Sequence, residues 1–269
     1  MDNKLSAWER MDLIRSQERP RASDYIEKIF ENFIECHGDR CFGDDGAIIG
    51  GIALFENRPV TVIANAKGKG LANNKKSNFG MAHPEGYRKA LRLMKQAEKF
   101  HRPIICLIDT PGAYCGKEAE ERGQHEAIAR NIAEMMQLKT LIISIIIGEG
   151  GSGGAMAMAV CDQLGMMQNA IYSVISPRGF ASILWKDSSR EREAANLIKI
   201  TAEDMLNFGV CDAIIPEPEG GCQKNFTDTI GKISVFIRNI LIQLDTMDIN
   251  QIINNRYNKY RKIEFFYEG

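Results

Sequence analysis

The sequence lacks a long hydrophobic run, and none of its apolar stretches approaches the roughly 20 residues that a membrane-spanning helix needs. Its first ten residues also lack the apolar core of a secretory signal peptide, so we expect a cytoplasmic protein with no membrane role. An excess of charge is missing too, because the formal net charge of the 269 residues is −1. No overall field would therefore recruit DNA or an anionic membrane surface.

Cysteine pairs with the spacing of a metal site are also missing. The seven cysteines are scattered, and no two of them have the Cys-x-x-Cys spacing of zinc ribbons. An odd number of cysteines argues against a disulfide framework, so we interpret them as reduced thiols and expect no metal site. With 44% hydrophobic and 26% charged residues, the composition is that of a soluble globular protein.

The first 45 residues predict helices. Ser6 and Glu9 have the three-residue spacing of a capping box, and Asp24 and Glu27 repeat it. We expect the second helix to end near Gly38 and to carry one apolar stripe of Ile26, Ile29, Phe30 and Phe33.

The rest of the chain alternates between strand-like and helix-like patterns. A turn at 56–58 separates two β-rich runs, 47–55 and 59–64, which predicts a hairpin. Further strands are expected at 103–108, 141–147, 170–175 and 213–215, and longer helices at 84–100, 118–136 and 230–244. Such alternation predicts an α/β fold with a mainly parallel sheet covered by helices.

The most informative segment is 148–154, where five of seven residues are glycine. It follows an apolar run and precedes a helix-like run, so we expect a strand, a tight loop and a helix. The first N–H groups of a helix have no partner within it. A cluster of such donors suits a bound anion or an oxyanion.

Two catalytic motifs match this segment in part. Residues 150–154 have the Gly-x-Ser-x-Gly spacing of a hydrolase nucleophile elbow, but all four histidines precede Ser152. This order disfavours a hydrolase, although other serine triads have other orders. Residues 148–153 have the dinucleotide spacing Gly-x-Gly-x-x-Gly, but the next strand, at 170–175, offers no acidic residue to a ribose.

A second glycine-containing loop follows the strand at 103–108. Its Asp-Thr-Pro-Gly at 109–112 resembles a GTPase motif, but no phosphate-binding loop accompanies it. Ligands of open α/β proteins lie beyond the carboxyl ends of the strands, so we expect the loops 109–116 and 148–154 to frame one cleft. Glycines can also serve close helix–strand packing alone, but five within seven residues favour a site.

Other polar residues near these loops have structural interpretations. We interpret Glu149 as a carboxylate that orders its loop, Asp109 as a cap of the following turn, and His83 and His125 as surface or capping groups. The lysines within 67–76 are interpreted as a solvated loop. Contact with a phosphate-bearing ligand such as coenzyme A is their functional alternative.

Several longer segments of the chain form a recognisable series. The segments are His-Gly-Asp-Arg (37–40), Asp-Asp-Gly-Ala-Ile-Ile-Gly-Gly (44–51), Asn-Phe-Gly-Met (78–81), Pro-Glu-Gly-Tyr-Arg-Lys-Ala (84–90), Asp-Thr-Pro-Gly-Ala-Tyr (109–114), Ala-Glu-Glu-Arg-Gly-Gln (119–124), the glycine segment itself, Tyr-Ser-Val-Ile-Ser-Pro (172–177) and Ala-Ser-Ile-Leu-Trp (181–185). In these segments the chain resembles the carboxyltransferase alpha subunit of bacterial acetyl-coenzyme A carboxylase. The resemblance covers about residues 24–221, and the order and number of the segments argue against chance.

The resemblance implies a crotonase-like (ClpP/crotonase) α/β fold of repeated ββα units. Its core would span 46–221, with an N-terminal helical segment at 1–45 and a C-terminal helical extension at 222–269. The implied activity moves a carboxyl group from N-carboxybiotin, held on the biotin carboxyl carrier protein, to acetyl-CoA, and gives malonyl-CoA for fatty acid synthesis. The implied partner is a beta subunit, in an α2β2 heterotetramer, which mainly holds the acyl-CoA and brings the zinc ribbon.

The resemblance also assigns the site. The expected catalytic groups are backbone amides that stabilise negative charge on the ureido oxygen of biotin, those of Gly150, Gly151, Gly153 and Gly154. The expected lining of the biotin cleft is Gly112, Ala113, Tyr114 and Ser152. Biotin's own nitrogen would then take the proton from the acetyl methyl group, since no acid/base pair stands near either loop. The alternatives are a stand-alone crotonase-type acyl-CoA enzyme and a decarboxylase-type carboxyltransferase subunit for another acyl-CoA.

A few positions depart from the family pattern. Cys115 stands where proline is usual, Arg178 replaces a glutamate, and Cys222 with Gln223 replaces Ala-His. None of these lies in the glycine segment. The basic and aromatic C-terminal stretch predicts either an interface helix or a surface tail.

Overall fold

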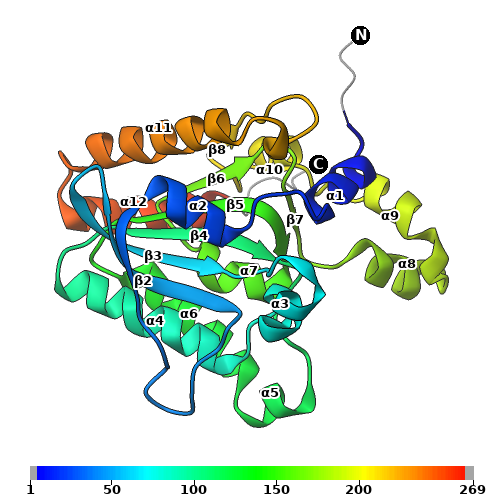
Figure 1. Ribbon diagram of the computed structural model, residues 1–269, viewed down its shortest axis with the longest axis horizontal. Helices are drawn as coiled ribbons and strands as arrows, with labels where there is room; N and C mark the ends of the chain where they lie inside the picture. The colour runs from blue at the N-terminus through cyan, green and yellow to red at the C-terminus, as the bar shows by residue number, and fades with distance from the viewer. Residues whose placement is uncertain (1–4, 264–269) are drawn as a thin grey trace.

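One eight-stranded sheet organises residues 5–263, which are the residues that the computed structural model describes. The strand order is β1-β2-β3-β4-β5-β6-β8, and β7 pairs with the carboxyl end of β5 (Figure 1). The pairs β1–β2 and β2–β3 are antiparallel and the others are parallel. The predicted α/β architecture is confirmed.

The strands are β1 (Glu31–Glu35), β2 (Ile48–Phe55), β3 (Arg58–Asn65), β4 (Ile104–Thr110), β5 (Ile142–Gly151), β6 (Gln163–Met167), β7 (Ile171–Ser173) and β8 (Ala213–Ile215). The helices are α1 (Ala7–Arg15), α2 (Ala22–Ile29), α3 (Gly70–Lys76), α4 (Pro84–Lys99), α5 (Lys117–Glu121), α6 (Gln124–Gln137), α7 (Ser152–Ala159), α8 (Pro177–Trp185), α9 (Glu191–Leu197), α10 (Ala202–Asn207), α11 (Phe226–Leu244) and α12 (Ile249–Lys262). Three short 3-10 turns lie at Asn78–Gly80, Ser188–Arg190 and Cys222–Lys224.

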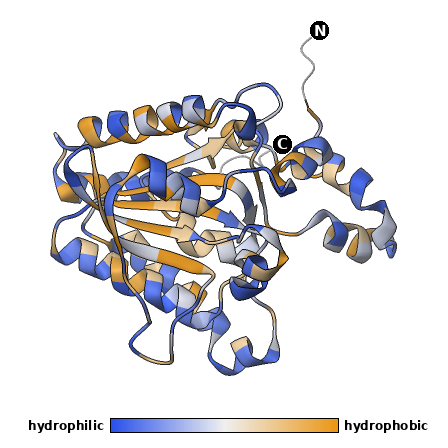
Figure 2. Ribbon diagram, viewed as in Figure 1, coloured by the Kyte–Doolittle hydropathy of each residue, from blue (hydrophilic) through white to orange (hydrophobic). Residues whose placement is uncertain are grey.

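Helices cover both faces of the sheet. α4, α6 and α7 pack on one face, and α2 and α11 pack on the other, while α8 and α9 stand to the side next to α1 (Figure 1). β4 is buried along its whole length, as expected for a parallel strand covered on both faces. Figure 2 shows the apolar central strands between helices whose outer faces are polar.

Local signals predicted several elements correctly. The capping box of Ser6 and Glu9 starts α1, and the predicted hairpin is β2–β3. Its turn places Glu56 and Asn57 at φ values of 49° and 64°, the left-handed conformation that two-residue hairpin turns require. The predicted amphipathic helix is α11, which buries Ile233, Ile237, Ile240 and Leu241.

The prediction that the second helix continues to about Gly38 is wrong, because α2 ends at Ile29. Phe30 is extended (φ −116°, ψ 140°), and Phe33, predicted on the helical stripe, lies in β1. The strand pairs with β2, so tertiary hydrogen bonding outweighs the local helical pattern. The capping interaction is also shifted, because Asp24 accepts a hydrogen bond from the Arg21 N–H (2.7 Å) rather than starting a helix itself.

Two further boundaries differ from the prediction. The helix expected at 118–136 is broken into α5 and α6, because Gly123 adopts a left-handed φ of 81°. β6 was not predicted, and its sequence Gln-Leu-Gly-Met-Met contains no β-branched residue.

The C-terminal basic stretch contributes a packed helix. Arg256 of α12 is fully buried and donates to both carboxylate oxygens of Asp162, each at 2.8 Å. Its other N–H groups bind the carbonyls of Met135, Leu138 and Thr140. Phe265 and Phe266 of the predicted stretch lie outside the described residues.

Candidate active site

The first predicted loop begins where β4 ends. Thr110 closes the turn, since its Oγ1 accepts from the Gly112 N–H (3.1 Å) and donates to the Gly112 carbonyl (2.7 Å). The interpretation of Asp109 as the cap of this turn is therefore wrong. The carboxylate of Asp109 instead accepts a hydrogen bond from the Glu149 N–H at 2.9 Å, across the sheet on β5.

The second predicted segment is ordered more regularly than a loop. β5 continues through Gly151, and Gly150 pairs with Thr110 of β4 on one side and Tyr172 of β7 on the other. α7 begins at Ser152, so the strand passes into the helix with no intervening residue. The Gly153 and Gly154 N–H groups thus lie in the first turn of a helix, where the helix supplies no acceptor.

Close backbone packing explains two of these glycines. A Cβ atom on Gly151 would stand 2.1 Å from the Pro111 carbonyl oxygen. A Cβ atom on Gly154 would stand 2.5 Å from the Ala113 nitrogen. The two predicted loops therefore touch, as the strand order requires, and frame one site.

The predicted donors differ in their access to solvent. Gly151 and Gly153 are half-buried and Ser152 is exposed, whereas Gly150 and Gly154 are buried. Ser152 has a left-handed φ of 50°, which is uncommon for a residue with a side chain. Backbone strain of this kind gathers at functional sites.

Two cavities meet at Ser152. The larger, of about 430 Å³, is mainly apolar and is lined by Ser152 and Met156 of α7, by the β7 segment and by Ile198, Ile200, Met205 and Val210. The smaller, of about 60 Å³, lies between Arg15, Pro111 and the end of β5. A ligand beside the α7 N-terminus would thus find an apolar wall on one side and a guanidinium group on the other.

Tyr114 is held by its neighbours. Its N–H donates to the Ala82 carbonyl at 3.0 Å, and its ring stacks on His83 with centroids 4.2 Å apart. His83 stands at the N-cap position of α4, but its side chain makes no capping hydrogen bond there; its ring instead contacts Tyr114 and forms a hydrogen bond with Asn78 Nδ2 (3.0 Å). His125 lies on the surface as predicted, with its side chain 87% exposed.

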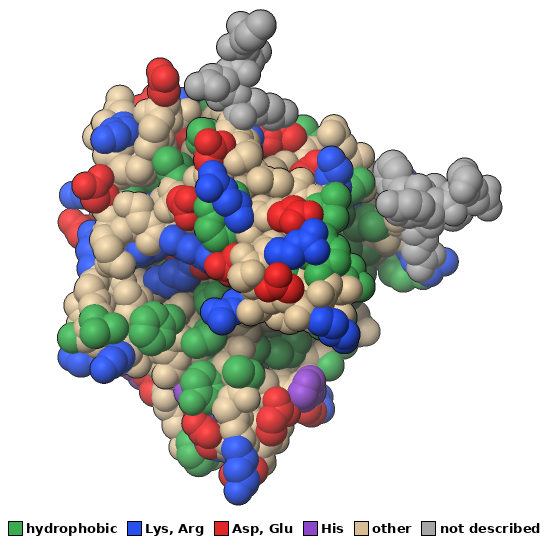
Figure 3. Space-filling view, turned by 90° about the vertical axis from the view of Figure 1, so that its right-hand side faces the viewer, with side chains coloured by type: hydrophobic (Ala, Val, Ile, Leu, Met, Phe, Trp, Pro, Cys, Tyr) green, Lys and Arg blue, Asp and Glu red, His purple; other side chains and the backbone are tan. Residues whose placement is uncertain are grey.

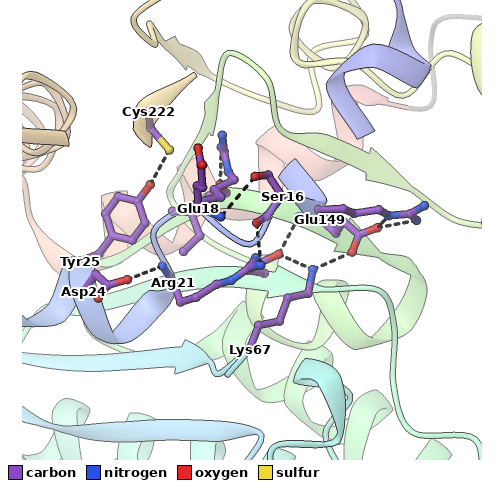
Figure 4. Close-up of polar contacts among 12 residues, drawn as sticks. Ser16, Glu18, Arg21, Asp24, Tyr25, Lys67, Glu149 and Cys222 are labelled. Atoms are coloured by element: carbon purple, nitrogen blue, oxygen red, sulfur yellow. Dashed lines mark hydrogen bonds and ion pairs between the residues drawn. The ribbon is translucent and has the colours of Figure 1, made fainter. Parts of the chain in front are cut away.

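A cluster of ion pairs, buried except for Arg15, surrounds Glu149 of the glycine segment (Figure 4). Lys67 Nζ lies 2.7 Å from Asp109 Oδ1 and 2.6 Å from Glu149 Oε2. The second Glu149 oxygen accepts from Arg15 Nε (2.9 Å) and Nη2 (2.7 Å). Arg21 Nη1 lies 3.6 Å from Asp109 Oδ2. These residues come from the N-terminal segment, from the end of β3 and from the ends of β4 and β5.

The cations of this cluster control the charge of Glu149. Burial alone raises the pKa of Glu149, but Lys67 and Arg15 outweigh it and lower that pKa to about 2. The carboxylate is therefore ionised at neutral pH, and its low pKa and the cations on both of its oxygens make it a weak general base. Its interpretation as a group that orders the segment is supported by these contacts.

The cluster also shows what the sequence interpretation missed. The assignment of Lys67 to a solvated loop is wrong, because its side chain is only 9% exposed. One signal was available: Lys67 follows β3, the parallel neighbour of β4, by two residues, and parallel strands bring their carboxyl ends together. Arg15 and Arg21 carried no comparable signal.

The side of the molecule that bears α1, α8 and α9 mixes positive and negative side chains with exposed hydrophobic ones (Figure 3). The exposed apolar residues of α8, α9 and the segment before α8 are Val174, Ile183, Leu184 and Leu197. Within residues 5–263, no helix is both long and apolar enough to cross a membrane, and no group of three His, Cys, Asp or Glu side chains is placed to hold a metal ion.

Comparison with known proteins decides the family. A family model described as acetyl co-enzyme A carboxylase carboxyltransferase-like matches residues 1–264. The chain belongs to this family. It is 55% identical over 266 residues to the acetyl-coenzyme A carboxylase carboxyl transferase subunit alpha of Clostridium acetobutylicum, which is 99% of this chain and 97% of that relative. A Clostridium botulinum alpha subunit (strain Alaska E43) is 58% identical over 96% of this chain and 94% of the relative.

A further relative agrees with this family, and a solved structure shows the same fold. In Clostridium tetani a protein named as subunits beta/alpha is 54% identical over 98% of this chain, which corresponds to 46% of its own length. The transcarboxylase 12S crystal structure aligns with a TM-score of 0.70 at 17% identity, covering 91% of this chain and 46% of that one. The fold of this carboxyltransferase family member is thus the crotonase-like fold expected from the sequence.

Proposed function

We propose that this chain is the alpha subunit of a two-subunit, biotin-dependent acetyl-CoA carboxyltransferase. Its identity of 55–58% to named alpha subunits, over nearly the whole of both chains, carries the proposal. The site geometry is consistent with it, because the two loops that the reaction needs meet at Gly151 and Gly154.

The reaction requires hydrogen-bond donors from this chain. Transfer of the carboxyl group from N-carboxybiotin leaves negative charge on the ureido oxygen. The half-buried Gly151 and Gly153 are the best placed of the predicted glycines to direct amides at that oxygen, and the buried Gly150 and Gly154 hold the backbone around them. One such donor stabilises a transition state by about 2.7–4 kcal/mol.

The remaining predicted residues would form the walls of the cleft. Gly112 and Ala113 support the turn from the β4 side, and Tyr114, fixed on His83, would line the rim. Ser152 would contact substrate through its exposed position between the two cavities. We propose that the cavity of about 430 Å³ takes the apolar part of the biotin group. The volume of this cavity lies within the range of ligand pockets.

A second subunit would complete the active site. The carboxylates at the glycine segment, Asp109 and Glu149, are already paired with cations of this chain, and a protein named as subunits beta/alpha joins both parts in one chain. The exposed Val174, Ile183, Leu184 and Leu197 support a partner surface on the α8–α9 side. We propose a beta subunit there, an α2β2 assembly, and a biotin carboxyl carrier protein that delivers the carboxyl group.

The product would be malonyl-CoA, used in fatty acid synthesis in the cytoplasm. The test uses the reverse reaction, the malonyl-CoA-dependent carboxylation of a free biotin analogue, with this chain alone and with its cognate beta subunit. We expect turnover only in the mixture. A stable complex without turnover would contradict the proposal, and turnover by the chain alone would indicate a stand-alone acyl-CoA enzyme.

A further inference from the structure

The glycine segment 148–154 has little intrinsic rigidity. Glycine loses more backbone freedom on folding than any other residue, so a segment with this composition is easily disordered. Yet donors to an oxyanion act only when they are held in place before the reaction. Some other part of the molecule must therefore hold the segment.

Different contacts hold the two halves of the segment. Gly151 and Gly154 are fixed against the backbone of the 111–113 loop. Gly150 is paired with β4 and β7, whereas at Gly148 the nearest neighbour is a side chain, since a Cβ atom there would stand 2.5 Å from Asp109 Oδ1. The absence of a side chain at Gly148 thus lets the Asp109 carboxylate approach the backbone of β5.

Glu149 is the one residue of the half 148–150 that has a side chain, and both of its carboxylate oxygens are bound. Lys67 takes Oε2 and Arg15 takes Oε1, while the Glu149 N–H donates to Asp109. Side chain and main chain of one residue are therefore fixed by three groups from three other segments. The cluster has three cations and two carboxylates, so it carries one positive charge in excess next to the turn.

We propose that Glu149 is a positioning residue, which Lys67 and Arg15 hold so that the amides of Gly151 and Gly153, two and four residues further along the chain, keep their donor geometry. The N-terminal segment, through Arg15, is then part of the active site. Glu149 itself does not touch the reacting atoms. This inference rests on the proposed function for its effect on catalysis.

The test compares two buried carboxylates at opposite ends of β5. Glu149→Gln alters the end at the glycine segment. The matched control is Asp162→Asn, because Asp162 is buried, pairs with Arg256 and accepts a hydrogen bond from the N–H of Ile142. Ile142 is the first residue of β5 and lies about 23 Å from Glu149 along the strand. Each change neutralises a carboxylate without altering its shape.

Two measurements are made on each variant of the full chain. The first is the hydrogen-exchange rate of the 150–154 amides in the chain alone. The second is kcat and KM of the complex with the beta subunit. We expect Glu149→Gln to speed exchange and lower kcat at least tenfold, with KM values changed less than threefold. Asp162→Asn should destabilise the fold but keep kcat and the 150–154 exchange rates within twofold of the unaltered chain.

Exchange at 150–154 unchanged in Glu149→Gln would overturn the proposal, and so would faster exchange without a fall in kcat, or an equal fall in Asp162→Asn. If Glu149→Gln does not fold, the half-exposed Arg15 replaces it: Arg15→Gln should speed the same exchange about threefold and Arg15→Lys should restore it. A lack of turnover by the unaltered complex would count against the proposed function, whereas the exchange rates would still decide whether Glu149 positions the segment.

Discussion

The Pro111 carbonyl oxygen occupies the space that a side chain on Gly151 would need, 2.1 Å from the position of a Cβ atom. Both groups are backbone, so neither can move aside as a flexible side chain would. Gly151→Ala should therefore force the two loops apart. We expect a loss of about 1–3 kcal/mol in the free energy of unfolding and at least a tenfold fall in kcat.

Gly153→Ala is the matched control for that change. A Cβ atom there would meet Ile128 at 3.5 Å, which is an ordinary contact. Alanine also favours the helix by up to about 1 kcal/mol over glycine, so this variant should be at least as stable as the parent. For both variants, urea unfolding gives the free energy of unfolding and a carboxyl-transfer assay gives kcat. Equal behaviour of the two would show that packing at Gly151 is unimportant.

The Ser152 hydroxyl is dispensable if the reaction uses backbone donors. We expect Ser152→Ala to retain at least half of the transferase activity, since the amide at this position is unchanged. Ser152→Gly relieves the left-handed φ of 50° and controls for backbone strain. Complete loss of activity in a folded Ser152→Ala variant would instead indicate a serine nucleophile.

The stability that Glu149 contributes should depend on pH. Its folded-state pKa of about 2 lies below the ordinary value of 4.5, so the contribution is present above pH 4.5 and is lost as the pH falls toward 2. The difference in unfolding free energy between the parent and Glu149→Gln should thus be constant from about pH 7 to 5 and shrink below that range. A difference that does not vary with pH would contradict the assigned ion pairs.

Thiol reactivity should separate the cysteines by exposure. Cys41 and Cys115 are exposed, Cys36 is half-buried, and the others are buried: Cys106, Cys161, Cys211 and Cys222. Burial raises the pKa of the Cys211 thiol to about 11, which further slows its reaction. We expect two fast thiols in a native titration, and expect a maleimide on Cys115 to block transfer through its position beside Tyr114. Cys115→Ala should keep its activity under the same treatment.

Arg256 should be a major contributor to the stability of α12. Arg256→Met leaves Asp162 buried without its partner, and breaking such a pair costs about 3–5 kcal/mol. Arg130→Met is the comparison, because Arg130 forms an exposed pair with Glu126 that is worth about 0.3–0.5 kcal/mol. Denaturant unfolding of the two variants should differ accordingly, and similar losses would refute the anchoring role.

The sequence was informative where the signal is local. The Ser6 capping box, the β2–β3 hairpin and the glycine segment each depend on residues close together in the chain, and each was predicted. The contact between Gly151 and Pro111 could also be anticipated, because neighbouring parallel strands end side by side.

Features that depend on distant residues were not predicted. The pair Arg15–Glu149 joins positions 134 residues apart, and no local pattern marks either residue as a partner. Lys67 sits among other lysines in a polar stretch, and only the register of β3 against β4 distinguishes it. The same limit explains β1, whose helical pattern is overruled by pairing with β2.

Within the described residues, the segment around α1 and the helix α12 both contact the single strand β5 or its neighbour. Arg19 donates to the Ile147 carbonyl and Arg15 holds Glu149, while Arg256 holds Asp162, which in turn binds the first residue of β5. A protein trimmed to residues 46–221 would lose all three arginines, and β5 would lose these contacts at both of its ends. Each terminal segment therefore anchors its own end of β5: the N-terminal segment holds the end at the glycine segment, and α12 holds the opposite end.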